Sequence, residues 1–240
     1  MSILRLVAGL LGLTFNRVAI YSAGIMPFKA VLFDLDGTLL DTLDDLADSM
    51  NAALASYGWP AHPVESYKFF VGDGFEVLAR RTMPPGSEDG LVRECVKVAQ
   101  GEYRKRWKSK TRLYPGIAEL LDGLAQRGVH SAILSNKPND FVIEIARHFF
   151  SRWKFAVAQG ARPDVPRKPD PTAALDISRR MGIPVESFLY LGDTNTDMET
   201  AIAAGMFPVG VLWGFRPEKE LRESGAKLLL GRPQDLLSHL

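Results

Sequence analysis

Two aspartates that follow a short apolar run carry the clearest chemical information in the chain. The run Ala30–Phe33 is typical of a strand buried on both faces, and Asp34 and Asp36 come after it. Because side chains two residues apart on an extended backbone point the same way, these carboxylates can converge on one spot. Gly37 then lets the backbone turn and approach a ligand closely. Two neighbouring carboxylates repel each other, so a hard cation such as Mg²⁺ is their natural partner.

Further polar residues come at or just beyond the ends of other expected strands. Ser135 follows an apolar run, Lys168 lies in the next long loop, and Asp193 ends a later strand, with Asp197 one helical turn further on. Each has a simpler interpretation when taken singly: a turn-forming serine, a solvated lysine, a strand-end acid, or an acid in the first turn of a helix. Ligands bind at the carboxyl edge of such sheets, which favours a joint functional interpretation.

Taken in order, these residues resemble the four motifs of the haloacid dehalogenase superfamily of phosphohydrolases. Phe33–Thr38 reads FDLDGT and is similar to the first motif. The strand-end serine, the Lys-Pro step at Lys168 and the run Gly192–Asp197 are similar to the other three. An aspartate pair alone would also fit a capped strand end with solvated acids, but the complete set does not. The resemblance extends from Phe28 to Leu237 and implies an enzyme that hydrolyses phosphate esters.

The resemblance implies a division of labour among four catalytic residues. Asp34 would attack phosphorus and become an aspartyl phosphate, which splits one difficult step into two. Asp36 would protonate the leaving oxygen and later take a proton from the hydrolytic water. Ser135 and Lys168 would neutralise the phosphoryl oxygens as charge builds up on them. Dehalogenases of this superfamily lack an acid at the position of Asp36, so C–halogen hydrolysis is not expected.

The same resemblance implies a Mg²⁺ site and a phosphate cradle. The metal would be bound by the carboxylates of Asp34 and Asp193 and by the carbonyl of Asp36. Asp197 would assist through water or by orienting Lys168. The residues expected to bind the phosphoryl group are Gly37, Thr38, Ser135, Asn136 and Lys168.

The periodicity of apolar residues predicts an α/β fold, a doubly wound parallel sheet with an inserted all-helical cap. Residues 28–42 and 113–240 are expected to form the Rossmann-like core, because short apolar runs alternate there with helical patterns. Residues 43–112 show only helical patterns, broken at Gly72–Gly74, and are expected to form the cap. The later expected strands are His130–Leu134, Phe155–Val157, Phe188–Leu191, Phe207–Leu212 and Lys227–Leu230. The expected core helices include Asp140–Phe149, Thr172–Met181, Met198–Ala204 and Glu218–Ser224.

Residues 1–27 differ from the rest of the chain and offer no chemistry. They carry two charges, Arg5 and Arg17, and the apolar run Val7–Phe15 is too short to span a bilayer. A basic start followed by an apolar middle is similar to a signal peptide. An upstream extension of the reading frame, with Met26 as an internal start, is the favoured alternative. Every motif lies beyond this segment, so we expect it to be dispensable.

Composition excludes several classes of function. The 240 residues are 46% hydrophobic and 24% charged, as is usual for a globular protein. The 29 Lys and Arg nearly balance the 28 Asp and Glu, so neither nucleic acid nor a membrane is an expected partner. The single cysteine, Cys95, cannot form an intrachain disulfide and suits a reducing cytoplasm. We expect a cytoplasmic monomer or homodimer whose partner is a small phosphorylated substrate.

Three segments narrow the substrate. Ser135–Pro138, the cap turn Phe70–Gly74 and Trp213–Phe215 resemble the phosphoglycolate phosphatase branch, which makes 2-phosphoglycolate the favoured substrate. Its carboxylate requires a cation. The residues expected to determine specificity are Gly72, Asp73, Gly74, Arg80, Arg81 and Lys137. The proline-rich loop Gly160–Pro166 and Asp170 depart from the pattern of that branch.

Other functions stay open at this point. Related caps act on sugar phosphates, nucleotides or pyrophosphate. Sugar-phosphate mutases carry a histidine-containing segment after the first motif, and Leu43–Leu46 contains no histidine. A phospho-receiver or degenerate binding module would be non-enzymatic and would also use an aspartate cluster and a lysine. Such receivers have no helical insert after the first strand and do not need the acid at Asp36.

Overall fold

A six-stranded parallel sheet forms the centre of the protein, described by a computed structural model over residues 28–240. The strand order is β5-β4-β1-β6-β7-β8, with β1 paired to both β4 and β6. The strands are β1 Ala30–Phe33, β4 His130–Pro138, β5 Phe155–Ala161, β6 Phe188–Gly192, β7 Phe207–Val211 and β8 Leu228–Leu230. This arrangement confirms the predicted doubly wound parallel sheet. The predicted N-terminal extension, residues 1–27, lies outside the described residues.

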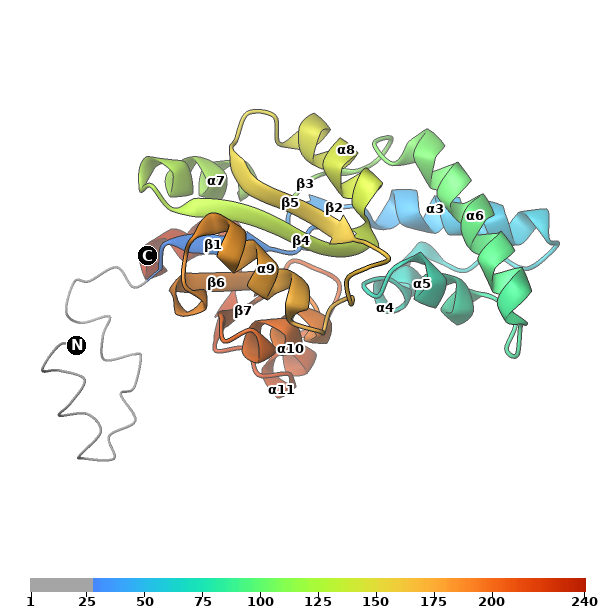
Figure 1. The fold of residues 1–240 in the computed structure, drawn as a ribbon. Helices are drawn as coiled ribbons and strands as arrows, with labels where there is room; N and C mark the ends of the chain where they lie inside the picture. Colours follow the sequence, from blue (N-terminus) through green and yellow to red (C-terminus); the bar gives the residue numbers. More distant parts are fainter. Residues whose placement is uncertain (1–27) are drawn as a thin grey trace, which may run out of the picture.

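Helices cover both faces of the sheet, as a parallel sheet requires. Buried residues of α7 and α8 belong to the layer on one face and those of α9 and α10 to the layer on the other, and Figure 1 shows α9 in front of the strands. Alternate residues of β1 pack into the two layers: Val31 and Phe33 into one, Ala30 and Leu32 into the other. The core helices are α7 Ile117–Gln126, α8 Asn139–Phe149, α9 Thr172–Met181, α10 Asn195–Ala203 and α11 Glu218–Glu223, with short 3₁₀ turns at Val185–Ser187 (η3) and Pro233–His239 (η4).

The helices inserted after the first strand lie together beyond one end of the sheet (Figure 1). They are α3 Leu43–Ser56, η2 Val64–Ser66, α4 Tyr67–Phe70, α5 Phe75–Thr82 and α6 Asp89–Arg106, and we call them the cap helices. Their buried residues include Cys95, whose thiol lies in the apolar interior. Among residues 28–240, no helix is both long and apolar enough to cross a membrane.

Several of the predicted ends of strands and helices are wrong. Strand β4 continues past Leu134 to Pro138, and β5 continues past Val157 to Ala161, because the two strands remain paired at their carboxyl ends. Helix α10 starts at Asn195, three residues before the expected start. The sequence also gave no indication of the two-stranded antiparallel pair β2 (Leu40–Asp41) and β3 (Arg112–Leu113), through which the chain enters and leaves the cap helices.

A buried carboxylate ties the first cap helix to the returning chain. Asp45 on α3 accepts hydrogen bonds from the backbone N–H groups of Lys110 and Thr111 and from the Thr111 hydroxyl, at 2.8–3.1 Å. Asp45 is almost fully buried. Its charge is therefore balanced by hydrogen bonds rather than by solvent. The contact fixes the residues just before β3 against α3.

We expect Asp45→Ala to lower the free energy of unfolding by about 2–3 kcal/mol, because it leaves three donors without an acceptor, two of them on the buried Thr111. Urea unfolding followed by circular dichroism measures this change. Asp44→Ala is the matched control, since Asp44 is the preceding residue on α3 and its side chain has no hydrogen bond to the described residues. Its loss should cost under about 1 kcal/mol, from the helix dipole alone. Equal losses in the two variants would contradict the anchoring role.

Candidate active site

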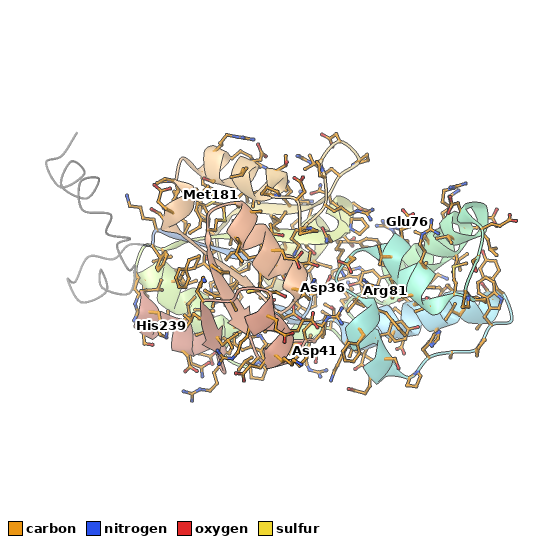
Figure 2. The ribbon with its side chains drawn as sticks, turned by 90° about the horizontal axis from the view of Figure 1, so that it is seen from below. Asp36, Asp41, Glu76, Arg81, Met181 and His239 are labelled. Carbon is orange, nitrogen blue, oxygen red and sulfur yellow. The ribbon has the colours of Figure 1, made fainter. Side chains whose placement is uncertain are left out.

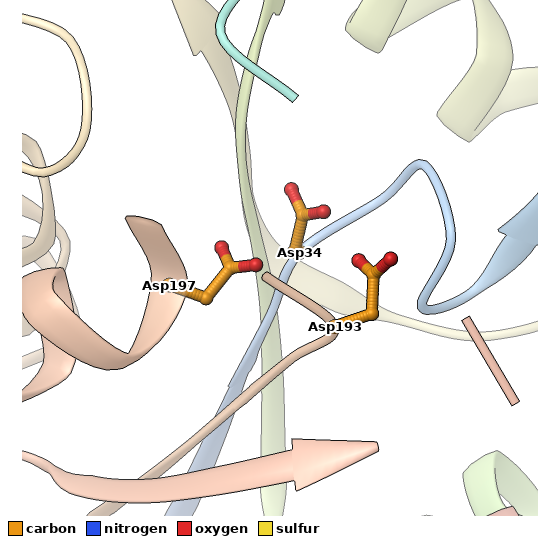
Figure 3. A group of neighbouring side chains, drawn as sticks. All are labelled: Asp34, Asp193 and Asp197. Atoms are coloured by element: carbon orange, nitrogen blue, oxygen red, sulfur yellow. The ribbon is translucent and has the colours of Figure 1, made fainter. Parts of the chain in front are cut away.

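Three aspartates meet at the carboxyl edge of the sheet, as the sequence predicted. Asp34 follows β1, Asp193 follows β6, and Asp197 lies in the first turn of α10. One carboxylate oxygen from each lies within 4.8 Å of the others, and all three residues are buried. Figure 3 shows the three side chains pointing toward the same side. Residues separated by more than 150 positions are brought together because β1 and β6 are neighbours in the sheet.

Lys168 neutralises part of this negative charge. Its Nζ atom donates to Asp34 Oδ1 and to Asp197 Oδ1, both at 2.7 Å. Burial alone would lower the pKa of this ammonium, but the charges of Asp197 and Asp34 outweigh it and hold the pKa well above its usual value. Lys168 is therefore a permanent cation that fixes the orientation of both carboxylates.

Asp197 has a second role, which explains why it lies at the start of a helix. Its Oδ2 accepts hydrogen bonds from the backbone N–H and the hydroxyl of Thr194, the residue that caps α10. The two residues form a capping box, in which each side chain satisfies a backbone N–H at the helix terminus. The two carboxylate oxygens of Asp197 therefore have different partners. Oδ2 caps the helix, as expected for an acid in the first turn, and Oδ1 accepts the hydrogen bond from Lys168.

Asp193 is fixed by groups from two other loops. Thr38 Oγ1 donates to its Oδ1 at 3.2 Å, and the backbone N–H of Phe215 donates to its Oδ2 at 2.8 Å. Each of these two loops can lie close to the Asp193 side chain because it has a glycine there. A Cβ on Gly37, whose φ is +84°, would lie 2.3 Å from Asp193 Oδ2, and a Cβ on Gly214 would lie 2.3 Å from Asp193 Cβ. The sequence singled out Gly37, but it gave no role to Phe215 in orienting the carboxylate.

The charge balance of the cluster suits a bound cation. Burial raises the pKa of Asp34 to about 7, with Lys168 opposing the shift and Asp197 adding to it. Burial likewise holds the pKa of Asp193 well above its usual range, and the charges of Asp34 and Asp197 add to the effect. Three hard oxygen ligands with excess negative charge are the donor set that Mg²⁺ takes. The residues present therefore fit the predicted metal.

A pocket opens beside these aspartates, between the core and the cap helices. It contains about 400 Å³ of empty space, part of it open to solvent. Its polar wall comes from the core and consists of Asp34, Asp36, Ser135 and Lys137. Its other wall comes from the cap helices and their loop and consists of Leu46, Val71, Gly72, Gly74, Phe75 and Leu78. A small ligand with one strongly anionic end matches this division.

The candidate specificity residues separate into two groups. Lys137, Gly72 and Gly74 line the pocket, whereas Asp73, Arg80 and Arg81 do not. Asp73 forms an ion pair with Arg81 at 2.6 Å and accepts a hydrogen bond from Thr196 at 3.2 Å.

Both arginines are committed to partners on the cap helices. Arg80 is ion-paired to Glu76 and Asp89 on the surface, and Arg81 donates to the Phe70 carbonyl. Figure 2 shows Glu76 and Arg81 on these helices. The structure therefore gives no support to the arginines as ligands of a substrate carboxylate, and Lys137 is left as the candidate.

Lys137 and Asn136 extend the polar wall in different ways. Lys137 Nζ donates to Asp36 Oδ1 at 2.9 Å and is almost fully buried. The Asn136 amide bonds the carbonyls of Lys168 and Gly72 and accepts from the Lys168 N–H. Its side chain thus joins the lysine loop to the cap loop, a role different from the phosphate binding that the sequence predicted. Of the predicted phosphate cradle, Ser135 lines the pocket and Thr38 is bonded to Asp193.

Comparison with known proteins places the chain in a family. Residues 31–211 match the model of the haloacid dehalogenase-like hydrolases, so the chain belongs to this family. It is 32% identical over 217 residues to the phosphoglycolate phosphatase of Pseudomonas savastanoi pv. phaseolicola, covering 87% of this chain and 78% of that protein. It is 33% identical over 205 residues to the phosphoglycolate phosphatase of Nitrosospira multiformis, covering 82% and 89%.

A solved structure agrees with these relatives. The crystal structure of a predicted phosphoglycolate phosphatase from Haemophilus somnus has a TM-score of 0.83 to this chain at 26% identity, covering 90% of this chain and 99% of that one. Together the comparisons confirm the resemblance inferred from the four motifs and the prediction of an enzyme of the phosphatase type.

We expect Gly214→Ala to weaken binding of a divalent cation about 10–100-fold, the usual effect of disturbing a group that orients a metal ligand. The added Cβ would lie 2.3 Å from Asp193 Cβ and 2.5 Å from the Gly37 carbonyl oxygen, so Asp193 must move. Calorimetric titration with Mg²⁺ measures the affinity. Gly231→Ala is the control, because a Cβ there meets nothing within 4 Å. Unchanged affinity in Gly214→Ala would contradict the assignment of Asp193 as a ligand.

Proposed function

We propose that this protein is a Mg²⁺-dependent phosphatase that hydrolyses a small phosphate monoester through an aspartyl phosphate, with 2-phosphoglycolate as its substrate. The observation that carries the proposal is the buried cluster of Asp34, Asp193, Asp197 and Lys168, in which Asp34 lines a pocket that also has the cation Lys137 in its wall. Small carboxylate-bearing esters match the size and charge of that pocket.

In this mechanism Asp34 is the nucleophile. Its Oδ1 accepts from Lys168, which fixes the carboxylate at the pocket wall. Attack on phosphorus expels the alcohol and leaves an acyl phosphate on Asp34, which water then hydrolyses. Asp34, Asp193 and the Asp36 carbonyl would bind the metal, with Asp197 in support, and the bound ion would supply positive charge to the phosphoryl oxygens. Ser135 and Lys168 would bind the phosphoryl group as its charge redistributes.

Asp36 is the proposed general acid and base. It lies two residues from the nucleophile, its carboxylate lines the same pocket, and it accepts a hydrogen bond from Lys137. It would protonate the leaving alcohol and then take a proton from the attacking water. A non-enzymatic receiver would need less of this arrangement, since a receiver has no leaving alcohol to protonate.

The substrate assignment rests on the relatives and on Lys137. Proteins about 32% identical are named phosphoglycolate phosphatases, and a carboxylate two atoms from a phosphate ester requires a cation close to the catalytic aspartates. Residues 43–112 would act as a cap that closes the pocket and excludes water. The cytoplasmic location, the monomeric or homodimeric state and the dispensability of residues 1–27 stay predictions.

A substrate panel tests the proposed function. We expect phosphate release to be fastest from 2-phosphoglycolate among esters that include sugar phosphates, nucleotides, pyrophosphate and p-nitrophenyl phosphate. Activity should disappear with EDTA and return with Mg²⁺, because the carboxylate cluster needs a divalent cation to bind the anionic substrate. A colorimetric phosphate assay measures both. Faster phosphate release from another ester would contradict 2-phosphoglycolate as the substrate, and turnover without a metal ion would contradict the mechanism.

The two leading aspartates should differ sharply in function. Asp34→Asn removes the nucleophile, so no phosphoenzyme should form. Asp36→Asn keeps the nucleophile but loses the proton shuttle, which is typically worth about 10²–10⁴-fold. With p-nitrophenyl phosphate, whose leaving group needs little protonation, Asp36→Asn should phosphorylate Asp34 and then stall. Mass spectrometry after an acid quench detects the adduct, and an adduct on residue 36 or an active Asp34→Asn enzyme would contradict these roles.

A further inference from the structure

One part of the pocket wall begins where a short helix of the cap ends. Helix α4 ends at Phe70, and Val71, Gly72 and Gly74, which follow it, line the pocket. The last carbonyl groups of a helix have no N–H partner within that helix, so donors from elsewhere must satisfy them. The position of this wall therefore depends on the groups that bind the carbonyls at the end of α4.

Arg216 of the core supplies such a donor. It lies between β7 and α11, and its Nη2 donates to the carbonyls of Phe69 and Val71 at 3.3 and 3.5 Å. Its Cζ atom lies 5.3 Å from the centre of the Phe69 ring, a distance at which a cation and an aromatic ring attract each other. On the core side, its Nε lies 3.7 Å from Glu220 Oε1 on α11. Only 11% of the Arg216 side chain is exposed, so these contacts fix its orientation.

The loop that carries Arg216 is itself fixed against the aspartate cluster. The backbone N–H of Phe215 donates to Asp193 Oδ2 at 2.8 Å, and Trp213 Nε1 donates to the Thr38 carbonyl at 2.9 Å. Arg216 follows Phe215 directly, so the loop contacts the catalytic edge at one end and the cap turn at the other. The core therefore contributes to the position of a wall whose residues belong to the cap.

We propose that Arg216 is a positioning residue that sets the selectivity of the pocket for a short phosphate ester. Arg216 does not line the pocket. It acts through Val71: by holding the carbonyls of Phe69 and Val71, it keeps the Val71 residue in the wall and the pocket narrow. Without this contact the wall is free to move away from a small ligand. The inference rests on the proposed function, because it concerns the substrate of the same site.

A second arginine that joins the cap helices to the core provides the matched control. Arg104 on α6 forms an ion pair with Asp140 on α8, and its guanidinium lies 4.5 Å from the centre of the Phe141 ring. Like Arg216, it combines a polar contact with a ring contact across the boundary between cap and core. Neither Asp140 nor Phe141 lines the pocket beside the aspartates. Arg104→Ala therefore removes a comparable contact without freeing the pocket wall.

The experiment makes two measurements on Arg216→Ala and Arg104→Ala in the full chain. Hydrogen exchange followed by mass spectrometry, without ligand, should show faster exchange of residues 67–74 in Arg216→Ala and wild-type exchange there in Arg104→Ala.

The second measurement is kinetic. In Arg216→Ala, kcat/KM for 2-phosphoglycolate should fall about tenfold, the usual effect of losing a hydrogen bond from a charged group, and should fall mainly through KM. For p-nitrophenyl phosphate, whose larger leaving group does not need a narrow pocket, kcat/KM should stay unchanged. Arg104→Ala should keep the wild-type ratio of the two values. Arg216→Lys should recover most of the ratio, because its ammonium can donate to the same carbonyls.

The outcomes separate this inference from the proposed function. Unchanged exchange of residues 67–74 in Arg216→Ala would overturn the inference, whatever the kinetics show. Faster exchange with an equal loss of kcat/KM for both esters, or with the same loss in Arg104→Ala, would make Arg216 a general contact between cap and core and would also overturn it. A wild-type enzyme that prefers another small ester would contradict 2-phosphoglycolate alone, because exchange and the selectivity for that ester over p-nitrophenyl phosphate would still decide the role of Arg216.

Discussion

The arrangement of the active-site loops depends on three buried carboxylates that lie close to one another and to the ammonium group of Lys168. Asp34, Asp193 and Asp197 bring more negative charge to the edge of the sheet than Lys168 neutralises. Uncompensated charge is costly away from water, so each oxygen must face a cation or a fixed hydrogen-bond donor. The tight loops at this edge supply those donors, and a glycine at position 214 lets one loop come close enough. The same charge excess suits the site to a divalent cation and then to a phosphoryl group.

The cap loop is joined to the core around this cluster by contacts that fix the second wall of the pocket. These contacts are Asn136 to Gly72, Thr196 to Asp73, and Arg216 to the carbonyls of Phe69 and Val71. A further ion pair links Arg104 on α6 to Asp140 on α8. Because Asn136 also bonds the backbone of Lys168, the loop that carries this lysine and the loop that lines the pocket share one side chain. The position of Lys168 and the position of the cap loop are thereby coupled in this conformation.

The aspartate cluster and the pocket beside it come from different parts of the chain. The charged cluster belongs wholly to the core, as do the residues that fix its geometry. The pocket is composite: its cation, Lys137, extends from β4, while its apolar wall and the Tyr103 ring beside the cation come from the cap helices. A family can therefore retain one hydrolytic mechanism while the inserted helices vary the ligand, which agrees with a match to the family model that spans both parts, residues 31–211.

The sequence by itself determined the sheet, the insertion of helices after the first strand and the types of polar residue that meet at the edge of the sheet. Each of these is encoded locally, since a buried strand followed by a polar residue places that residue at the ligand-binding edge whatever the rest of the chain does. The tertiary structure decided which cation lines the pocket. Arg80 and Lys137 look equally suitable in the sequence, yet packing turns one toward acids on the surface and encloses the other beside Asp36. The sequence contained no local indication that Tyr103 would lie beside Lys137, because that contact depends on α6 packing against β4 and α8, a long-range contact that no short pattern of residues encodes.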